Sequence, residues 1–278
     1  MLPCTVTAIM TCFNRREQTL TCLGALFAQQ TVQGCTLAVV LVDDGSTDGT
    51  ADAVRKAFPQ VTVLMGNGKL YWCGGMRKAY EHAVQTPPDF ILWLNDDVTL
   101  ATDAISRLLT TAAGHLRSIM IGAMVDPDTN VLSYSGWYRT GGVRWDNLAQ
   151  RLLSDQVQPC DTFNGNCVLI PRAVYDVVGN LDRHFTHAMG DFDYGFRAGK
   201  AGFASLVAPG VAGTCSRNPC IKGNWRDRSL PFHTRARKLF AKKGCPPLEW
   251  MVYTRRHAGP LWPLYWVSPY VKFILGIR

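Results

Sequence analysis

Aliphatic runs alternate with amphipathic stretches along the first 125 residues, and this alternation limits the possible folds more than any other feature of the chain. The stretch that contains Leu20, Leu23 and Leu26, for example, has apolar residues at helical spacing. Parallel strands joined by right-handed helical crossovers produce this order, so we predict an α/β fold with a mostly parallel central sheet and helices on both faces. The predicted strands are 6–10, 37–42, 61–65, 90–94 and 119–125, and the predicted helices are 16–29, 51–58, 74–84 and 104–113.

Polar clusters follow three of the predicted strands. They comprise residues 11–14, the pair Asp43 and Asp44, and residues 95–97. In open parallel sheets, ligands bind beyond the carboxyl ends of the strands, so these clusters are expected to meet at one edge. The pattern weakens over residues 126–159, which are expected to form a loop-rich insertion over that edge.

The adjacent carboxylates of Asp96 and Asp97 are candidates for a metal site. Two carboxylates about 4 Å apart repel by roughly 4 kcal/mol at an effective dielectric constant of 20, so a site that keeps both ionised usually supplies a cation. Mg²⁺ and Mn²⁺ accept one or two carboxylates and complete their shell with phosphate oxygens and water. The alternative is that this pair only begins a loop and caps the next helix.

Two further acidic clusters each have a functional and a structural interpretation. Asp43 and Asp44 can be turn formers, or a carboxylate there can accept the imide N–H of a pyrimidine base. Asp191 or Asp193 can supply a general base towards a hydroxyl, which typically contributes about 10² to 10⁴ in rate. Alternatively, they begin a helix, where acidic residues are favoured, and Asp193 pairs with Arg197 one turn later.

The basic charge is concentrated at the C-terminus. The formal net charge of the 278 residues is +8. Residues 1–216 carry 16 Lys and Arg against 19 Asp and Glu, a net of −3, whereas residues 217–278 carry 13 against two, a net of +11. We therefore predict a domain over 1–216 and a basic, aromatic extension over 217–278. This extension suits an anionic membrane surface or a nucleic acid, or it packs on the domain through its tryptophans.

Compartment signals are few. The ten cysteines contain no C-x-x-C pair, and several lie in apolar runs, so we expect reduced thiols. The N-terminus has no basic region before its apolar run, and the longest apolar stretch, 261–277, is interrupted by Pro263, Pro269 and Lys272. A cytoplasmic protein is expected, acting at the inner face of the membrane if the extension binds there.

Five motifs in register carry a resemblance to a family. In order, they are TCFNR (11–15), VDDGSTD (42–48), LNDD (94–97), GNCVLIPR (165–172) and GDFDYGFR (190–197). Over about residues 5–215 the chain resembles a family 2 glycosyltransferase with the GT-A nucleotide-sugar fold. The segment GNGKLYWCGG (66–75) is similar to the rhamnosyltransferase-like branch.

The resemblance implies a role for each motif. Asp97, with Asp96, would ligate Mn²⁺ or Mg²⁺ on the donor diphosphate, and Asp191 would be the base that deprotonates the acceptor hydroxyl. Asp193 and Arg197 would orient their loop. Donor binding would fall to Thr11, Arg15, Asp43, Asp44, Asn67, Lys69, Trp72 and Asp96.

The implied activity is inverting, metal-dependent transfer of a single sugar. The donor would be a UDP- or dTDP-linked sugar, and the acceptor a hydroxyl of a glycan or lipid-linked glycan. Two departures from the family pattern are visible. Residues 211–215 lack the histidine that members often place near the metal, so His184, His187 or a residue of the C-terminal extension would substitute, or the metal would be held more weakly. No glutamine follows Gln158, so the Q-x-x-R-W motif of processive synthases is missing.

Other functions remain as rivals. A nucleotidyltransferase would share the acidic edge but usually has a glycine-rich phosphate loop after the first strand. A Rossmann oxidoreductase would need G-x-G-x-x-G there, and residues 11–14 provide neither. A nucleic-acid-binding protein would explain the basic extension but not three acidic clusters at one edge.

Overall fold

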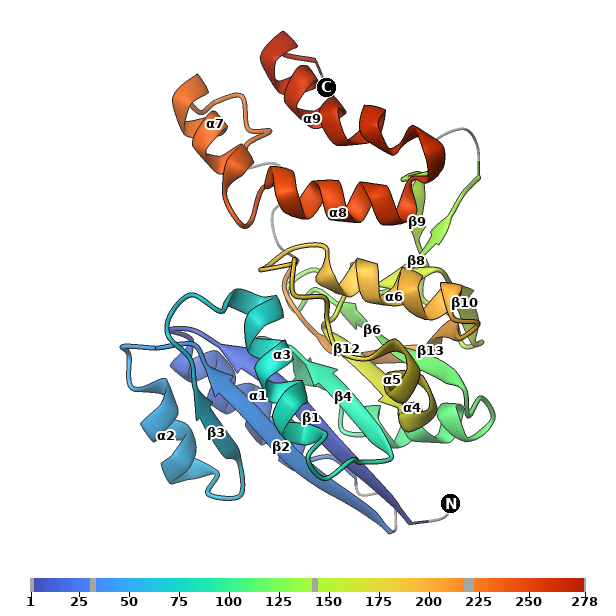
Figure 1. The fold of residues 1–278 in the computed structure, drawn as a ribbon. Helices are drawn as coiled ribbons and strands as arrows, with labels where there is room; N and C mark the ends of the chain where they lie inside the picture. Colours follow the sequence, from blue (N-terminus) through green and yellow to red (C-terminus); the bar gives the residue numbers. More distant parts are fainter. Residues whose placement is uncertain (1–2, 31–33, 142–144, 218–222, 278) are drawn as a thin grey trace.

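The computed structural model describes residues 3–30, 34–141, 145–217 and 223–277. Its centre is a ten-stranded sheet in which the order β10-β13-β6-β12-β4-β1-β2-β3 forms the main path (Figure 1). The four strands at one end of this path are parallel, as predicted. These strands and the helices between them are β1 (Cys4–Cys12), α1 (Arg16–Phe27), β2 (Cys35–Asp43), α2 (Thr50–Ala57), β3 (Thr62–Met65), α3 (Tyr71–Ala83) and β4 (Phe90–Leu94).

The other half of the sheet is mixed. Strand β12 lies between β4 and β6 and is antiparallel to both, whereas β13 is parallel to β6. The sequence predicted the strand β6 but did not predict β12. An aliphatic run also does not encode the direction of a strand, so the antiparallel pairing of β12 with β6 was not predictable. The elements of this half are β5 (Thr99–Leu100), α4 (Ala104–Ala113), β6 (Ser118–Val125), β12 (Cys167–Pro171), α5 (Arg172–Val178), α6 (Gly190–Lys200) and β13 (Ala204–Thr214).

The expected loop-rich insertion contains short strands. Strands β11, β8 and β9 form a separate three-stranded sheet, while β7 pairs with β6 and β10 with β13. Runs of two to four residues carry too little periodicity to be recognised in a sequence. Their bounds are β7 (Leu132–Tyr134), β8 (Gly136–Arg139), β9 (Leu148–Gln150), β10 (Gln158–Cys160) and β11 (Thr162–Phe163).

Side-chain alternation on the buried strands builds one core on each face of the sheet. Leu92 and Leu94 of β4 join a cluster with α1, α2 and α4, and Ile91 and Trp93 join another with α3, α5 and α6. Trp93 meets Tyr194 of α6 with ring centroids 4.8 Å apart. Helices therefore cover both faces, as the sequence indicated.

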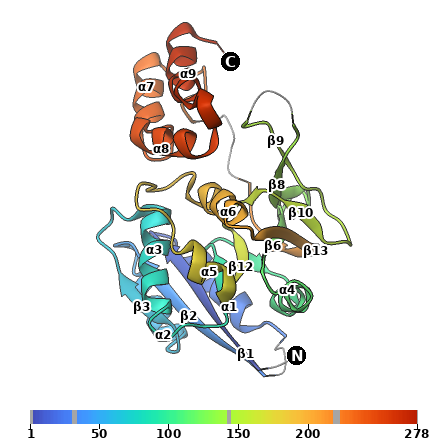
Figure 2. The same ribbon diagram turned by 45° about the vertical axis from the view of Figure 1, so that its right-hand side comes forward.

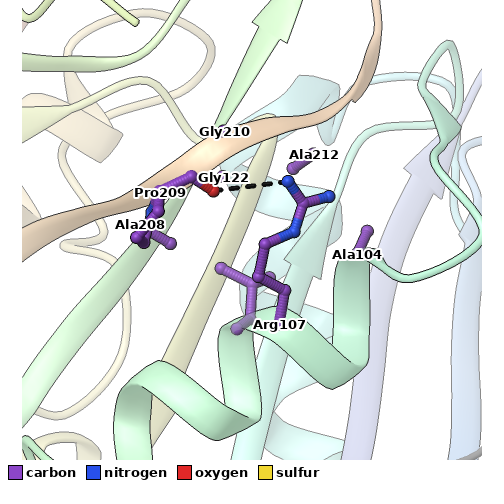
Figure 3. A pocket seen from close by; sticks show the side chains of 8 residues that line it. Ala104, Arg107, Gly122, Ala208, Pro209, Gly210 and Ala212 are labelled. Atoms are coloured by element: carbon purple, nitrogen blue, oxygen red, sulfur yellow. Dashed lines mark hydrogen bonds between the residues drawn. The ribbon is translucent and has the colours of Figure 1, made fainter. Parts of the chain in front are cut away.

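A bulged stretch of β13 is held by Arg107 of α4. The pairing of β13 with β6 shifts register twice between Val207 and Gly213. Arg107 reaches across the small hollow there and donates to the Pro209 carbonyl at 3.3 Å (Figure 3). It also donates to the Val211 carbonyl at 2.9 Å. This hollow is thus a structural junction filled by a cation.

The described part of the C-terminal segment is helical. It contains α7 (Phe232–Phe240), α8 (Pro247–His257), a 3₁₀ turn (Gly259–Leu261) and α9 (Trp262–Leu275), with a small core around Leu239, Cys245 and Phe273. Figures 1 and 2 show these helices gathered beyond α6, on the side of the body away from the N-terminus. Nine of the ten cysteines lie in the described residues, and all nine are free thiols; Cys220 lies outside them. Over the described residues, no helix is long and apolar enough to cross a membrane.

Candidate active site

Asp96 and Asp97 lie just beyond β4, where Arg15 contacts both. The Arg15 Nη1 atom is 3.0 Å from Asp96 Oδ1 and 2.8 Å from Asp97 Oδ2. Asp96 is buried and its Oδ2 has no hydrogen-bond partner, whereas Asp97 is partly exposed. Burial raises the pKa of Asp96 to about 6, although Arg15 opposes this rise and Asp97 adds to it. One arginine thus neutralises only part of the charge of two carboxylates, so the pair can bind a further cation.

The second acidic pair shapes the loop before α3. Asp44 Oδ1 accepts a hydrogen bond from the Gly68 amide and Oδ2 accepts one from the Tyr71 amide, both at 2.9 Å. Asp43 Oδ1 accepts from the Ser46 amide at 2.6 Å, and its buried Oδ2 has no partner. Asp43 therefore forms a turn, as one interpretation expected, whereas Asp44 holds the loop before α3. The contact of either residue with a base stays a prediction.

Trp72 joins the separate motifs. Its indole Nε1 donates to Asn95 Oδ1 at 2.7 Å, next to the Asp96–Asp97 pair. Its ring also lies against Gly165, where an added Cβ would come within 2.5 Å of the indole. Gly165 in turn donates its amide to Asp191 Oδ2 at 3.1 Å. A chain of direct contacts therefore links the first turn of α3, the end of β4 and Asp191.

Asp191 lies in the first turn of α6 with the environment of a poised base. Its Oδ1 accepts from the Phe192 amide at 2.9 Å. Burial raises its pKa to about 6, and the two backbone amides limit the rise. A carboxylate with such a pKa is ionised at neutral pH yet more basic than usual, which suits proton abstraction from a hydroxyl.

Asp193, two residues later, is fully paired. It accepts from Arg197 at 2.8 Å, as the spacing predicted, and also from Arg256 at 2.6 Å and His257 at 2.8 Å, both in α8. Burial opposes ionisation, but the His257 hydrogen bond and the two arginines lower its pKa. The network holds α8 against α6, so Asp193 positions the helix that carries Asp191.

The other predicted donor residues surround this edge. Thr11 is buried against α3, where Gly75 has no room for a Cβ, and donates to the Val42 carbonyl at 3.2 Å. Asn67 Oδ1 accepts from the amide of Lys69, whose side chain is exposed. Their contacts with a nucleotide sugar stay predictions.

Strained backbone marks the same edge. Four described non-glycine residues have positive φ, and three of them begin elements of the site: Asn14 before α1, Tyr71 at the start of α3 and Met189 before α6. Such conformations cost about 1–3 kcal/mol each and concentrate at functional sites. Nothing in the sequence signalled them.

The residues suit a hard divalent cation that shares its shell with a substrate. Asp96 Oδ2, buried and unpartnered, and the exposed carboxylate of Asp97 are the oxygen donors that Mg²⁺ or Mn²⁺ prefers. No group of three or more His, Cys, Asp or Glu able to hold a metal occurs among the described residues, so further ligands would have to come from elsewhere. The thiol of Cys215 stands beside Asp97, with Sγ 3.6 Å from Oδ1.

The two candidate histidines differ. His184 pairs with Asp182, with Nδ1 2.7 Å from Oδ1. His187 is half-buried and its Nδ1 has no partner; burial, helped by the charges of Lys243 and Arg15, lowers its pKa to about 4. His187 is therefore neutral at neutral pH, and the positive charge of Arg15 is one reason.

Sequence reasoning gave no role to Asn95, Cys215, Arg256 or His257. Asn95 was visible within its motif, and Trp250, Tyr253 and His257 have the spacing of one helical face, a signal that would have predicted a buried α8. The pairing of Arg256 with Asp193, 63 residues away, leaves no local signal.

Comparison with known proteins identifies the family. Two curated relatives each match more than half of the chain. The N-acetylglucosaminyl-diphospho-decaprenol L-rhamnosyltransferase of Mycobacterium tuberculosis is 27% identical over 197 residues, covering 62% of this chain and 64% of the relative. Galactofuranosyltransferase GlfT2 of Mycolicibacterium smegmatis is 26% identical over 232 residues, covering 72% of this chain and 35% of the relative. The chain thus spans less than two thirds of either relative's length.

Solved structures agree on the fold. A mannosyltransferase from Pyrobaculum calidifontis, in complex with GDP-Man and Mn²⁺, superposes with a TM-score of 0.59 at 16% identity, covering 92% of this chain and 65% of that one. TarS of S. aureus superposes with a TM-score of 0.57 at 15% identity, covering 92% and 44%. The fold is therefore GT-A, as the motifs implied. Because the model of the family Glycosyl transferase family 2 matches residues 7–179, the chain belongs to that family.

Proposed function

We propose that this protein is an inverting, metal-dependent glycosyltransferase that moves one sugar from a nucleoside-diphosphate sugar to a hydroxyl of a lipid-linked glycan. The observation that carries the proposal is the run of contacts through Trp72, which brings the Asp96–Asp97 pair and Asp191 to one edge of the sheet. Family membership supports the reaction class, and the rhamnosyltransferase relative, whose name specifies a diphospho-decaprenol acceptor, supports the acceptor class.

The reaction needs a base on one side of the sugar and a sink for negative charge on the other. Asp191 accepts the proton of the acceptor hydroxyl while that oxygen forms a bond to the anomeric carbon. The bond from this carbon to the diphosphate breaks, and the leaving group keeps the electron pair. A divalent cation held by Asp97 and Asp96 would neutralise that charge when bound.

Arg15 adds a resident positive charge at the same place. Its guanidinium contacts both carboxylates and is partly exposed, so it can also contact a diphosphate oxygen. Asp44 keeps loop 66–71 in position, and we expect Thr11, Asn67 and Lys69 to contact the donor. We propose that residues 217–278, whose helix α8 is held against α6, contact the acceptor or a membrane surface.

Thermal unfolding with nucleotides tests the proposal. We would measure Tm with UDP, dTDP and GDP, each with and without Mn²⁺. A ligand at 100 times its Kd should stabilise the protein by about 2.7 kcal/mol. A Mn²⁺-dependent rise with UDP or dTDP is expected; no shift with any nucleotide would contradict the proposal, and a shift with GDP alone would change the donor.

A further inference from the structure

Helix α9 presents an exposed aliphatic face. Its side chains are Leu264, Val267, Val271, Ile274 and Leu275, exposed by 64, 40, 42, 73 and 63%. They follow one another at spacings of three, four, three and one residues, which places them on one side of the helix. We call these five residues the α9 aliphatic face.

The opposite side of α9 is already occupied. Trp266 Nε1 donates to the Pro247 carbonyl at 3.0 Å, and the Tyr270 hydroxyl donates to the Cys245 carbonyl at 3.0 Å. Phe273 is buried and stacks on Phe232, with ring centroids 4.9 Å apart. The aromatic side thus fixes α9 to α7 and α8, so the α9 aliphatic face cannot turn inward without breaking these contacts.

Such a face is unusual for a helix in water. A surface helix normally has polar residues on its outer side, but Lys272 is the only charged residue in α9. Contiguous exposed apolar side chains commonly mark a surface that binds another body.

Positive charge lies near the C-terminal end of α9. Arg228 donates to the Gly276 carbonyl, and the Arg235 guanidinium lies 5.1 Å from the Phe273 ring centroid. With Lys272, these cations border the C-terminal end of α9, within a segment whose net charge is +11. Two copies of this surface would repel each other, whereas anionic lipid headgroups would be attracted.

We infer that the α9 aliphatic face docks the protein onto an anionic lipid surface, lying parallel to it. Fourteen residues give a helix about 21 Å long, short of the roughly 30 Å hydrocarbon core, so α9 can lie in the interface but not cross it. The inference deepens the proposed function and rests on it for the lipid-linked acceptor. Because α8 contacts both α9 and Asp193, docking here would fix the orientation of α6, which carries Asp191, relative to the membrane.

Vesicle flotation of the full chain tests the inference. We would use vesicles of phosphatidylcholine with and without phosphatidylglycerol, at low and high salt. The test variant is Leu264→Glu with Ile274→Glu; both sites are highly exposed, so the fold should persist. The matched control is Leu116→Glu with Val177→Glu, which changes two similarly exposed aliphatic residues elsewhere (69 and 64%).

We expect wild type and control to bind the anionic vesicles, more weakly at high salt, and the test variant to bind about tenfold or more weakly. No wild-type binding, or equal binding by the test variant, would overturn the inference. Light scattering that showed a dimer lost only in the test variant would assign the face to a second copy instead. The nucleotide-dependent Tm shift is read separately: the test variant should keep it, and its absence in wild type would count against the function, not the docking.

Discussion

Asp191 and Asp193 lie two residues apart on α6, yet their surroundings are opposite. Asp193 contacts two arginines and a histidine, and its pKa is lowered despite burial. Asp191 accepts only backbone amides, and its pKa is raised to about 6. One carboxylate is saturated by cations, and the other is left basic.

The same contrast separates Asp193 from the Asp96–Asp97 pair. There, one arginine serves two carboxylates, and one buried oxygen of Asp96 has no partner. A buried charge that is completely paired has nothing left to offer a substrate, whereas incomplete pairing costs stability and is usually kept for a function. Pairing is thus a better guide than residue type or motif position to the carboxylates that are available for the proposed reaction.

The largest expected effect is on transfer by Asp191→Asn. The amide keeps the size of the side chain but cannot accept the hydroxyl proton, so the transfer rate should fall by about 10² to 10⁴. The nucleotide-dependent Tm shift should stay, because donor binding does not use this group. Asp52→Asn, at an exposed carboxylate, is the matched control. Transfer at the wild-type rate would remove Asp191 from the role of base.

Asp193→Asn should act on stability instead. It leaves Arg256 and Arg197 beside a neutral amide in a buried site, and breaking a buried pair in this way typically costs about 3–5 kcal/mol. Urea denaturation would measure the loss. Asp97→Asn is the informative comparison, since its partly exposed ion pair should contribute less than about 1 kcal/mol. Equal losses for the two variants would contradict the contrast between structural and functional carboxylates.

The sequence was sufficient to predict where the acidic pairs lie in the fold. Aliphatic runs before Asp43 and Asp96 predicted buried strands, and parallel crossovers then implied that both pairs share an edge. The pairing state was not predictable, because it depends on Arg15, which is 81 residues from Asp96, and on α8, which is 63 residues from Asp193. The composition of residues 217–278 suggested a basic surface but concealed that Arg256 and His257 face inward.

Asp97→Asn should also affect metal-linked donor binding. Removing one of two carboxylate charges weakens the hold on a divalent cation, so the Mn²⁺-dependent part of the nucleotide shift should fall by at least about 1.4 kcal/mol, a factor of ten in Kd. The shift without Mn²⁺ should change little. A full Mn²⁺-dependent shift in this variant would place the cation elsewhere, with His187 and Cys215 as the next residues to replace.

The smallest effect links Asp191 to pH. Its pKa is raised in the folded protein, to about 6, so ionisation at neutral pH costs folding free energy that is recovered as the pH falls through 6 towards the unfolded-state value of about 3.9. Asp191→Asn removes this cost. The NH₂ group of the variant cannot accept the hydrogen bond that the Gly165 or Phe192 amide gives to the carboxylate, and this loss does not depend on pH. Since one pKa unit corresponds to about 1.4 kcal/mol and the site is partly exposed, the stability of the variant relative to wild type should be higher at pH 7.5 than near pH 4 by about 1 kcal/mol. Wild-type transfer should decline below about pH 6 as the base is protonated. Urea denaturation at both pH values measures the change, and a difference that did not vary with pH would mean that Asp191 is not held in the basic state on which its proposed role depends.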